Sequence, residues 1–465
     1  MNEQLNYLQN FAESYIQKTK TSKQIAQNYR SVFADPRVVN NFNPTFKEMC
    51  YPIVGQRALG SKIWDIDGNE YIDLMMGFGI NLFGHNPSFI QVALQEQLEK
   101  GFPIGPQAEF AGEVAQLICE LTGMERVAIS NTGTEAVMTA IRIARAATKR
   151  QKIVIFSGSY HGHFDGTLVD AKTAANFQAL PSASGVLPNF VADVLVLEYG
   201  NFQSLEIIKT HQHELAAILV EPVQSSRPNL QPKEFLQALR QVTQAADIAL
   251  IFDEMVTGFR IHPGGAQAWF DVKADIATYG KIVGGGIPIG IIAGSAIYMD
   301  KIDGGMWNYG DDSYPSVETT FFAGTHCKHP LSLAAARAVL QYLKEQGVVL
   351  QEQLNQRTSL FIQHLNAYFA AEDLPIQMAN FGSLFAPASI GGTATSNASE
   401  SSMGVDLLTY HLLHKGILLR GGGNFLSTAH TDDDIQRILA AIKESVTDLQ
   451  AAKILPIPSQ KLTKV

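Results

Sequence analysis

The sequence predicts an α/β protein in which helices cover a mostly parallel β-sheet. From Ser88 onward, short apolar runs alternate with stretches of helical spacing, which is the pattern typical of such a sheet. The chain has 465 residues, of which 46% are hydrophobic, so it has enough material for a large core and two domains. We expect strands at residues 126–130, 152–156, 193–197, 216–220, 248–252 and 291–295.

The segments before this sheet have patterns of their own. Apolar residues recur at helical spacing over residues 5–19, which predicts an amphipathic helix, and a second, polar helix follows towards Tyr29. Apolar and polar residues alternate on both sides of Asp67-Gly68, and an Asp-Gly pair between such runs is a strong signal of a β-hairpin. We expect this hairpin, at 63–73, to belong to a smaller domain.

The composition argues against several classes of protein. The formal net charge is −9 and basic residues do not cluster strongly, so the sequence lacks the footprint of a nucleic-acid-binding protein. Three widely spaced cysteines and an N-terminus without an apolar signal-peptide core indicate a reducing, cytoplasmic location. The longest uncharged run, 282–299, contains five glycines and a proline, which fits a packed turn and strand better than a bilayer helix. We therefore expect neither nucleic acid nor a membrane as a partner.

Lys281 and Asp253 are candidate catalytic residues. Lys281 lies in an apolar, glycine-rich run, where desolvation favours the neutral amine that attacks a carbonyl to form a Schiff base. A lone lysine is more commonly a surface residue, but Asp253 ends an apolar run and would point into the crevice where open α/β sheets bind ligands. A carboxylate facing a pyridine nitrogen is what pyridoxal 5'-phosphate requires, because the protonated ring accepts electrons from the substrate carbon. The pair therefore predicts this cofactor.

The turn after the first strand is a candidate phosphate site. Asn131 to Glu135 leads from the strand into a helix, where free N–H groups and the positive end of the helix dipole can hold a phosphate. The hydroxyl of Thr134 would add a donor. The alternative is an N-cap, which threonine and glutamate commonly form at helix starts without any ligand.

Polar and aromatic residues also follow two other strands. Tyr160 is a candidate for stacking on a flat cofactor ring, with a packing tyrosine as the alternative. His161 and His163 lack a third ligand at a suitable spacing, so we expect no metal. The segment from Glu221 to Ser226 would face the same crevice.

From Tyr51 to about Asp434, the chain resembles the class III aminotransferases, which are fold-type I pyridoxal-phosphate enzymes, and within them glutamate-1-semialdehyde aminomutase and its relatives. The resemblance implies a large domain with a mostly parallel seven-stranded sheet and a smaller α+β domain. It places a helical extension at 1–40, the small domain at 41–85 and 330–455, the large domain at 86–329 and a linker-like tail at 456–465. The motifs that carry it are Trp64-Asp65-Ile66-Asp67-Gly68, Asn131-Thr132-Gly133-Thr134-Glu135-Ala136, Tyr160-His161-Gly162-His163, Glu221-Pro222-Val223, Phe252-Asp253-Glu254, Thr257-Gly258-Phe259-Arg260 and Gly280-Lys281.

The resemblance implies a role for each matching residue. Lys281 would bind the cofactor covalently and move protons, Asp253 would pair with the ring nitrogen, and Tyr160 would stack on the ring. Apart from the resemblance, we expect Arg260 to be a structural ion-pair residue. Thr325 would reach the phosphate of the neighbouring subunit, which implies a homodimer with shared active sites. The other residues implied to line the cofactor are Gly133, Thr134, Glu221, Ser226 and Met255.

Departures from the family pattern bear on the substrate. Aminomutases of this group bind the substrate carboxylate with a serine and an arginine upstream of the hairpin, whereas residues 43–48 here contain no arginine, and Ser226 replaces an asparagine. Other segments are similar to the aminotransferase domains of hybrid polyketide and nonribosomal peptide synthetases of the iturin, mycosubtilin and microcystin type. Those domains aminate the β-carbon of a β-keto acyl thioester on an acyl carrier protein. The similar segments are 61–64, 76–85 and 262–270.

We therefore expect transfer of an amino group from a donor amino acid, glutamate or glutamine, to a carrier-bound β-keto thioester. Arg420 is a candidate ligand for the donor carboxylate, with a surface arginine as the alternative. A free-standing glutamate-1-semialdehyde 2,1-aminomutase or a small-molecule ω-aminotransferase is the alternative function. A nucleotide-binding oxidoreductase is disfavoured, because the turn at 131–134 lacks the required glycine pattern.

Overall fold

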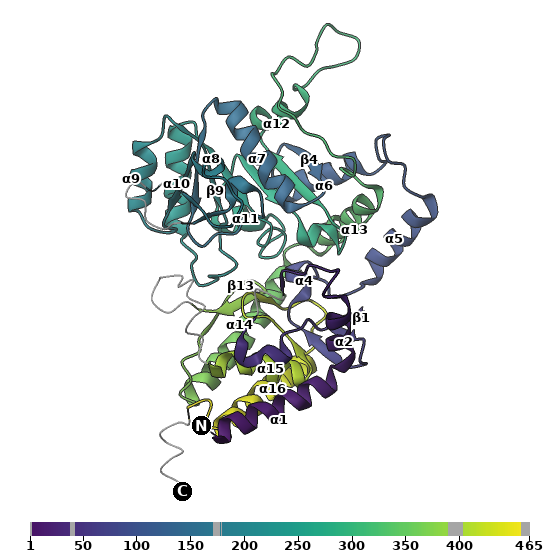
Figure 1. The fold of residues 1–465 in the computed structure, drawn as a ribbon. Helices are drawn as coiled ribbons and strands as arrows, with labels where there is room; N and C mark the ends of the chain where they lie inside the picture. The colour runs from purple at the N-terminus through teal and green to yellow at the C-terminus, as the bar shows by residue number, and fades with distance from the viewer. Residues whose placement is uncertain (1, 38–41, 171–176, 178, 389–402, 457–465) are drawn as a thin grey trace.

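A seven-stranded sheet organises the upper part of the molecule in Figure 1. The computed structural model describes residues 2–37, 42–170, 177, 179–388 and 403–456. The order of the strands is β4-β12-β11-β10-β9-β5-β8. β12 runs antiparallel to both of its neighbours and the other adjacent strands are parallel, which confirms the predicted mostly parallel sheet. The strands are β4 (Arg126–Ser130), β5 (Lys152–Phe156), β8 (Val194–Leu197), β9 (Leu215–Val220), β10 (Ala249–Asp253), β11 (Ile276–Tyr279) and β12 (Gly290–Gly294).

Helices cover both faces of this sheet. Side chains alternate between the two faces of a strand, and in β10 Leu250 and Phe252 enter one hydrophobic cluster whereas Ala249 and Ile251 enter another. The first cluster includes residues of α6, α10 and α13, and the second includes residues of α7, α8 and α12. The helices of this part are α5 (Ser88–Lys100), α6 (Ala111–Thr122), α7 (Gly133–Thr148), α8 (Pro188–Val191), α9 (Gln203–Thr210), α10 (Lys233–Ala245), α11 (Gly265–Phe270), α12 (Ala296–Asp303) and α13 (Pro330–Gln346). Three short elements complete it, namely the 3-10 helix η2 (Asp165–Thr167) and the paired strands β6 (Val169–Asp170) and β7 (Leu180–Pro181).

The lower part in Figure 1 combines both ends of the chain. The predicted hairpin is present, with Ile63 paired to Tyr71, and the C-terminal strand β15 lies parallel to β3 beside it. This sheet has the order β1-β2-β3-β15, and β13, β14 and β16 form a second sheet. The elements are α1 (Asn2–Lys18), α2 (Lys20–Tyr29), η1 (Pro44–Met49), β1 (Gly55–Leu59), β2 (Lys62–Asp65), β3 (Glu70–Asp73), α4 (Met76–Gly79), α14 (Val349–Ala371), β13 (Met378–Phe381), β14 (Leu384–Pro387), α15 (Met403–His414), β15 (Ile417–Leu418), β16 (Asn424–Phe425) and α16 (Asp432–Ala451).

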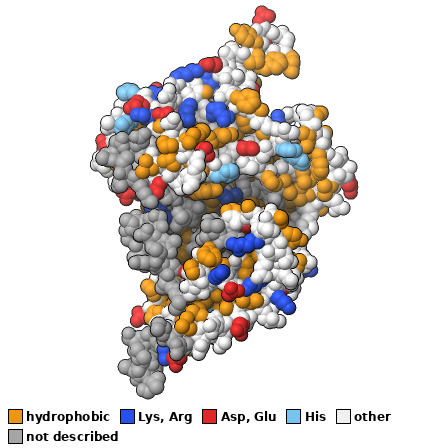
Figure 2. Space-filling view, viewed as in Figure 1, with side chains coloured by type: hydrophobic (Ala, Val, Ile, Leu, Met, Phe, Trp, Pro, Cys, Tyr) orange, Lys and Arg blue, Asp and Glu red, His pale blue; other side chains and the backbone are white. Residues whose placement is uncertain are grey.

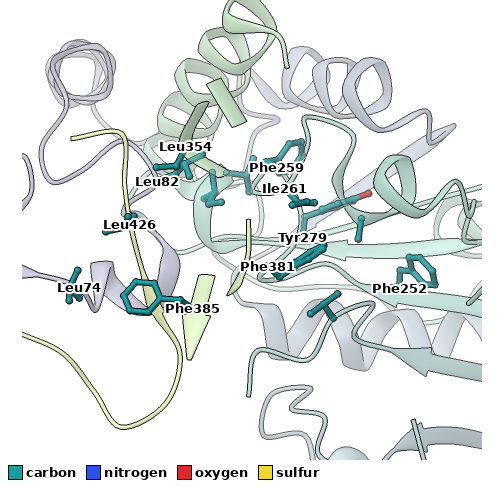
Figure 3. Packing of buried hydrophobic residues seen from close by; sticks show 14 of the residues in the cluster. Leu74, Leu82, Phe252, Phe259, Ile261, Tyr279, Leu354, Phe381, Phe385 and Leu426 are labelled. Atoms are coloured by element: carbon teal, nitrogen blue, oxygen red, sulfur yellow. The ribbon is translucent and has the colours of Figure 1, made fainter. Parts of the chain in front are cut away.

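One hydrophobic cluster connects the two parts. Figure 3 shows Phe252 and Tyr279 of the large sheet, then Phe259 beyond them, and finally Leu82 and Leu426 of the lower part. All of these side chains are buried. None of the helices in the described ranges is long and apolar enough to cross a membrane. Most of the predicted tail at 456–465 lies outside the described residues.

The predicted N-terminal helix packs against α15 through aromatic rings. The ring of Phe11 stacks on the imidazole of His411, with a centroid distance of 4.1 Å and an interplanar angle of 3°. The hydroxyl of Tyr7 lies 3.2 Å from Nε2 of the same histidine. Burial lowers the pKa of His411 to about 4, so this contact is made by the neutral imidazole at neutral pH.

This histidine should make stability depend on pH. When folding lowers the pKa of a histidine, the free energy of unfolding decreases as the pH falls below the pKa of that histidine in the unfolded chain. The reason is that the unfolded chain binds the proton more tightly. Between about pH 7 and pH 5, we expect the melting temperature of the parent to fall more than that of a His411→Phe variant, measured by calorimetry. Burial also lowers the pKa values of His414 and His430, but both remain in the variant. Equal slopes for the two proteins would contradict the assignment to His411.

Candidate active site

Five strands of the large sheet deliver five of the predicted site residues to one edge. β10 ends at Asp253, β9 leads into Glu221, β5 into the loop that holds Tyr160, β4 into Gly133, and β11 into Lys281. The carboxyl ends of parallel strands lie at the same edge of a sheet, which is where open α/β folds bind ligands. The sequence therefore brings together residues that are up to about 150 positions apart.

Lys281 begins the 3-10 helix η3 (Lys281–Gly284) in a strained backbone conformation. Its φ angle is +45°, in the left-handed region that residues with a side chain rarely adopt. Burial of the amine lowers the pKa of Lys281, while Asp253 and Glu221 act in the opposite direction. The positive charges of Arg260 and Arg420 lower it further. This environment favours the neutral, nucleophilic amine that the sequence predicted.

Asp253 is buried and accepts hydrogen bonds on both carboxylate oxygens. Oδ2 lies 2.7 Å from Nδ1 of His161. Oδ1 accepts from the Thr278 hydroxyl and from the Met255 amide, each at 3.2 Å. Sequence reasoning missed His161 and Thr278. Thr278 lies opposite Asp253 in the pairing of β10 with β11. The register of these two strands could have identified Thr278, but β11 was not among the predicted strands.

The start of α7 has both of the features that the sequence left as alternatives. The side chain of Thr132 caps the helix by accepting from the Glu135 amide at 3.2 Å. Within the described chain, no hydrogen bond is recorded for the amides of Gly133 and Thr134, which belong to the first turn. A Cβ on Gly133 would lie 2.8 Å from Sδ of Met255, so the backbone approaches that side chain closely. The N-cap therefore leaves two amides that could hold a phosphate.

Tyr160, Glu221 and Ser226 meet beside this turn. The buried carboxylate of Glu221 accepts from the Tyr160 amide at 2.9 Å, and the tyrosine side chain is 67% exposed. The Ser226 hydroxyl donates to the carbonyl of Gly158 at 3.3 Å. Burial raises the pKa of Glu221, with Asp253 acting in the same direction and His161 against it. Glu221 thus anchors the loop that presents the Tyr160 ring. Among the described residues, no cluster of three histidine, cysteine or acidic side chains is suited to a metal ion.

Two arginines lie close enough to affect the Lys281 pKa. The guanidinium carbon of Arg420 lies 5.0 Å from the centre of the Phe78 ring, and no acidic partner is found for Arg420 in the described part of the chain. Partial burial lowers the pKa of Arg420. This cation, which has no acidic partner in the described part of the chain, could bind a carboxylate.

The expectation that Arg260 forms a structural ion pair is wrong for the residues that the structure describes. Arg260 is almost fully buried and bonds to the carbonyls of Val256 and Gly79 and to the Ser383 hydroxyl, while its guanidinium lies over the Phe425 ring at 4.6 Å. No carboxylate pairs with it among the residues that the structure describes. Burial lowers the pKa of Arg260 to about 9. The segments it joins belong to the upper and lower parts of the molecule, so sequence spacing gave no sign of these partners.

Thr325 follows Gly324, where a Cβ would lie 3.3 Å from Nδ2 of Asn131, two residues before Gly133. Thr325 is exposed and lines a cavity of about 300 Å³ together with 103–107 and 327–330. None of the other predicted site residues lines this cavity. A role for Thr325 in a neighbouring subunit stays a prediction.

The chain matches the model of the family described as aminotransferase class-III over residues 45–446. It belongs to this family. It is 36% identical over 399 residues to glutamate-1-semialdehyde 2,1-aminomutase 2 of Lachnoclostridium phytofermentans, covering 84% of this chain and 90% of that protein. The aminomutase of Archaeoglobus fulgidus is 35% identical over 404 residues, covering 85% and 93%.

Solved structures of transaminases share the fold. An omega-transaminase from Sphaerobacter thermophilus superposes with a TM-score of 0.82 at 27% identity, covering 92% of this chain and 98% of that one. A β-phenylalanine aminotransferase from Variovorax paradoxus gives 0.81 at 28% identity, with coverage of 97% and 99%. The class-III aminotransferases are pyridoxal-phosphate enzymes of fold type I, and this chain is a pyridoxal-phosphate-dependent aminotransferase.

The residues present fit this cofactor. The desolvated amine of Lys281 matches the aldehyde of the cofactor. The hydrogen-bonded carboxylate of Asp253 matches its ring nitrogen, and the two amides at the start of α7 match its phosphate. Nε2 of His161 is buried without a hydrogen-bond partner among the described residues, next to this carboxylate. The exposed ring of Tyr160 could cover a flat ligand.

Proposed function

We propose that the enzyme moves the amino group of a carboxylate-bearing substrate at the site formed by Lys281 and Asp253. The observation that carries the proposal is the presence of a desolvated amine and a buried, hydrogen-bonded carboxylate at one sheet edge. Bound pyridoxal phosphate supplies an electron sink through its protonated ring. Lys281 holds the cofactor and carries the proton at its Nζ between substrate and cofactor positions, since its neutral amine can act as a base.

The remaining predicted residues bind and orient the cofactor. Asp253 keeps the ring nitrogen protonated, and the amides of Gly133 and Thr134 bind the phosphate. Tyr160 covers one face of the ring, and Met255 lies towards the other, against Gly133 and Gly280. Glu221 and Ser226 support the loop that carries Tyr160.

Arg420 is the proposed ligand for the substrate carboxylate, because it is a cation without an acidic partner in the described chain. We expect Arg420→Met to raise the KM for an amino-acid donor by about a hundredfold, because an arginine can hold a carboxylate through two charged hydrogen bonds. The same variant should use a primary amine without a carboxylate as well as the parent does. Steady-state kinetics with both donors measures this. An equal loss for both donors would exclude Arg420 as a carboxylate ligand.

Two candidates remain for the overall reaction. The named relatives favour a glutamate-1-semialdehyde 2,1-aminomutase, in which donor and acceptor are one small molecule. The second candidate is amination of a β-keto thioester on an acyl carrier protein, with glutamate or glutamine as donor. The support for this candidate is that residues 43–48 contain no arginine to bind a substrate carboxylate. These residues lie mainly in η1, where Phe46 is buried and Lys47 is exposed. A thioester has no free carboxylate to bind.

One assay separates these reactions. The purified, cofactor-loaded enzyme is given glutamate-1-semialdehyde alone, or isotopically labelled glutamate with a β-keto acyl group on a carrier protein. Mass spectrometry and chromatography then follow the products. An aminomutase yields an isomer of the same mass without any donor, whereas the second reaction transfers the labelled nitrogen to the acyl chain. If neither substrate reacts but labelled glutamate loses its amino group to another keto acid, both substrate proposals fail and the transaminase remains.

We also propose that a second copy of this chain covers the loop between α12 and α13. This loop projects at the top of Figure 1, and Figure 2 shows hydrophobic side chains gathered on it. Met306, Tyr309, Tyr314 and Phe321 are each at least 70% exposed, and the loop leads directly to Thr325. An exposed apolar projection of this kind marks a contact surface in soluble proteins. Light scattering should give the mass of a homodimer, and a monomer at micromolar concentration would contradict the proposal.

A further inference from the structure

His161 makes the shortest hydrogen bond to Asp253. Nδ1 lies 2.7 Å from Oδ2, and both residues are only 3% exposed. A carboxylate offers acceptors alone, so the hydrogen in this contact belongs to the imidazole. Hydrogen bonds to an ionised group are shorter and stronger than neutral ones, and a low local dielectric strengthens them further.

The imidazole has no competing partner. Nε2 of His161 is buried and, in the ranges that the structure describes, makes no hydrogen bond. The other two donors to Asp253 are longer, at 3.2 Å, and both reach Oδ1. His161 is therefore the donor that holds Oδ2, whereas the other two donors hold Oδ1.

The two residues that flank His161 in its loop, Tyr160 and Gly162, are both held by tertiary contacts. The amide of Tyr160 donates to the buried Glu221 carboxylate at 2.9 Å. Gly162 has a φ of +81°, and a Cβ there would lie 2.4 Å from Oγ1 of Thr134, so only glycine allows this approach. The loop thus packs against the start of α7 while its central side chain reaches Asp253, which places the imidazole with little freedom to move.

We propose that His161 is a positioning residue, which by donating Nδ1–H to Asp253 keeps that carboxylate aimed at the ring nitrogen of the cofactor. The inference rests on the proposed role of Asp253. Its consequence is that the donor position matters more than the imidazole ring. An asparagine side chain places an amide donor near the position of Nδ1, whereas the longer glutamine places it near that of Nε2.

Three variants test this: His161→Asn, His161→Gln and His161→Leu. The affinity of each cofactor-free protein for pyridoxal phosphate is measured by equilibrium titration, and the visible absorbance of the bound cofactor is followed against pH. We expect His161→Leu and His161→Gln to bind the cofactor about tenfold more weakly, the loss of one hydrogen bond to a charged group. Their absorbance midpoint should move to higher pH, because a ring nitrogen that loses its positive charge no longer favours deprotonation of the bound cofactor. His161→Asn should retain the affinity and midpoint of the parent.

His163→Leu is the matched control, because this histidine lies two residues along the same loop with an exposed side chain. It should leave both readouts unchanged. The proposal is overturned if His161→Leu and His161→Gln differ from the parent no more than the control does, or if asparagine fares no better than glutamine. Where the leucine variant does not fold, the asparagine and glutamine pair decides the question.

A double variant separates this inference from the function on which it rests. If His161 acts through Asp253, His161→Leu combined with Asp253→Asn should bind the cofactor no more weakly than Asp253→Asn alone. Additive losses would overturn the role of His161. If Asp253→Asn alone leaves the spectrum and affinity unchanged, the proposed role of Asp253 fails instead.

Discussion

Replacing Lys281 with alanine should abolish turnover, with a fall in kcat of at least about 10⁴-fold. The amine both holds the cofactor and carries the proton, so its removal eliminates two functions at once. The structure provides for the neutral amine by burying it, and burial is the largest cause of its lowered pKa. Lys281→Arg should be inactive too, because a guanidinium stays charged.

A chemical readout distinguishes this effect from unfolding. After treatment with borohydride, the parent should carry the cofactor mass on the peptide that contains Lys281, and the alanine variant should carry none. The melting temperature of the cofactor-free variant should equal or exceed that of the parent, since a desolvated amine costs stability. Lys209→Ala removes only an exposed ion pair with Glu206 and should have no effect on turnover. A Lys281→Ala enzyme that keeps a covalently bound cofactor and the parental rate would refute the proposed site.

Local sequence was sufficient for four of the five strands that lead to site residues, namely β4, β5, β9 and β10. Apolar runs placed β4 and β5 with the correct limits and the other predicted strands within one residue at each end. β11 was missed because Ile276–Tyr279 has only four residues, two of them the small or polar Ala277 and Thr278. The absence of β11 from the prediction mattered for the site, because Thr278 of β11 donates a hydrogen bond to the Asp253 carboxylate.

The partners of each site residue depend on tertiary contacts that spacing does not encode. His161 and Asp253 are 92 positions apart and meet because β5 and β10 end at the same edge of one sheet, with only β9 between them. The sequence presented His161 beside His163 as a possible metal pair, whereas only His161 is buried in the site. Arg260 was expected to form an ion pair, but its partners come from β14's turn, α4 and its own segment. Residue types at strand ends therefore predict chemistry, and packing decides which side chains support it.

Asp253→Asn should lower kcat/KM by about 10³-fold, because a neutral amide cannot hold the ring nitrogen of the cofactor in its protonated form. The substitution conserves shape, so it tests charge more than packing. An asparagine also offers one acceptor where the aspartate accepts from His161, Thr278 and the Met255 amide. The absorbance of the bound cofactor should therefore change together with the kinetics.

The neighbouring acid provides the control for this variant. Glu254 is as deeply buried, but it accepts from the Ala266 and Gln267 amides at the start of α11 and from the Thr257 hydroxyl. Burial raises the pKa of Glu254 to about 7. Glu254→Gln should lower the melting temperature, since an amide cannot accept all three bonds, and should leave the cofactor spectrum unchanged. If Asp253→Asn affected only stability and Glu254→Gln changed the spectrum, the carboxylate that pairs with the cofactor would have been assigned to the wrong residue.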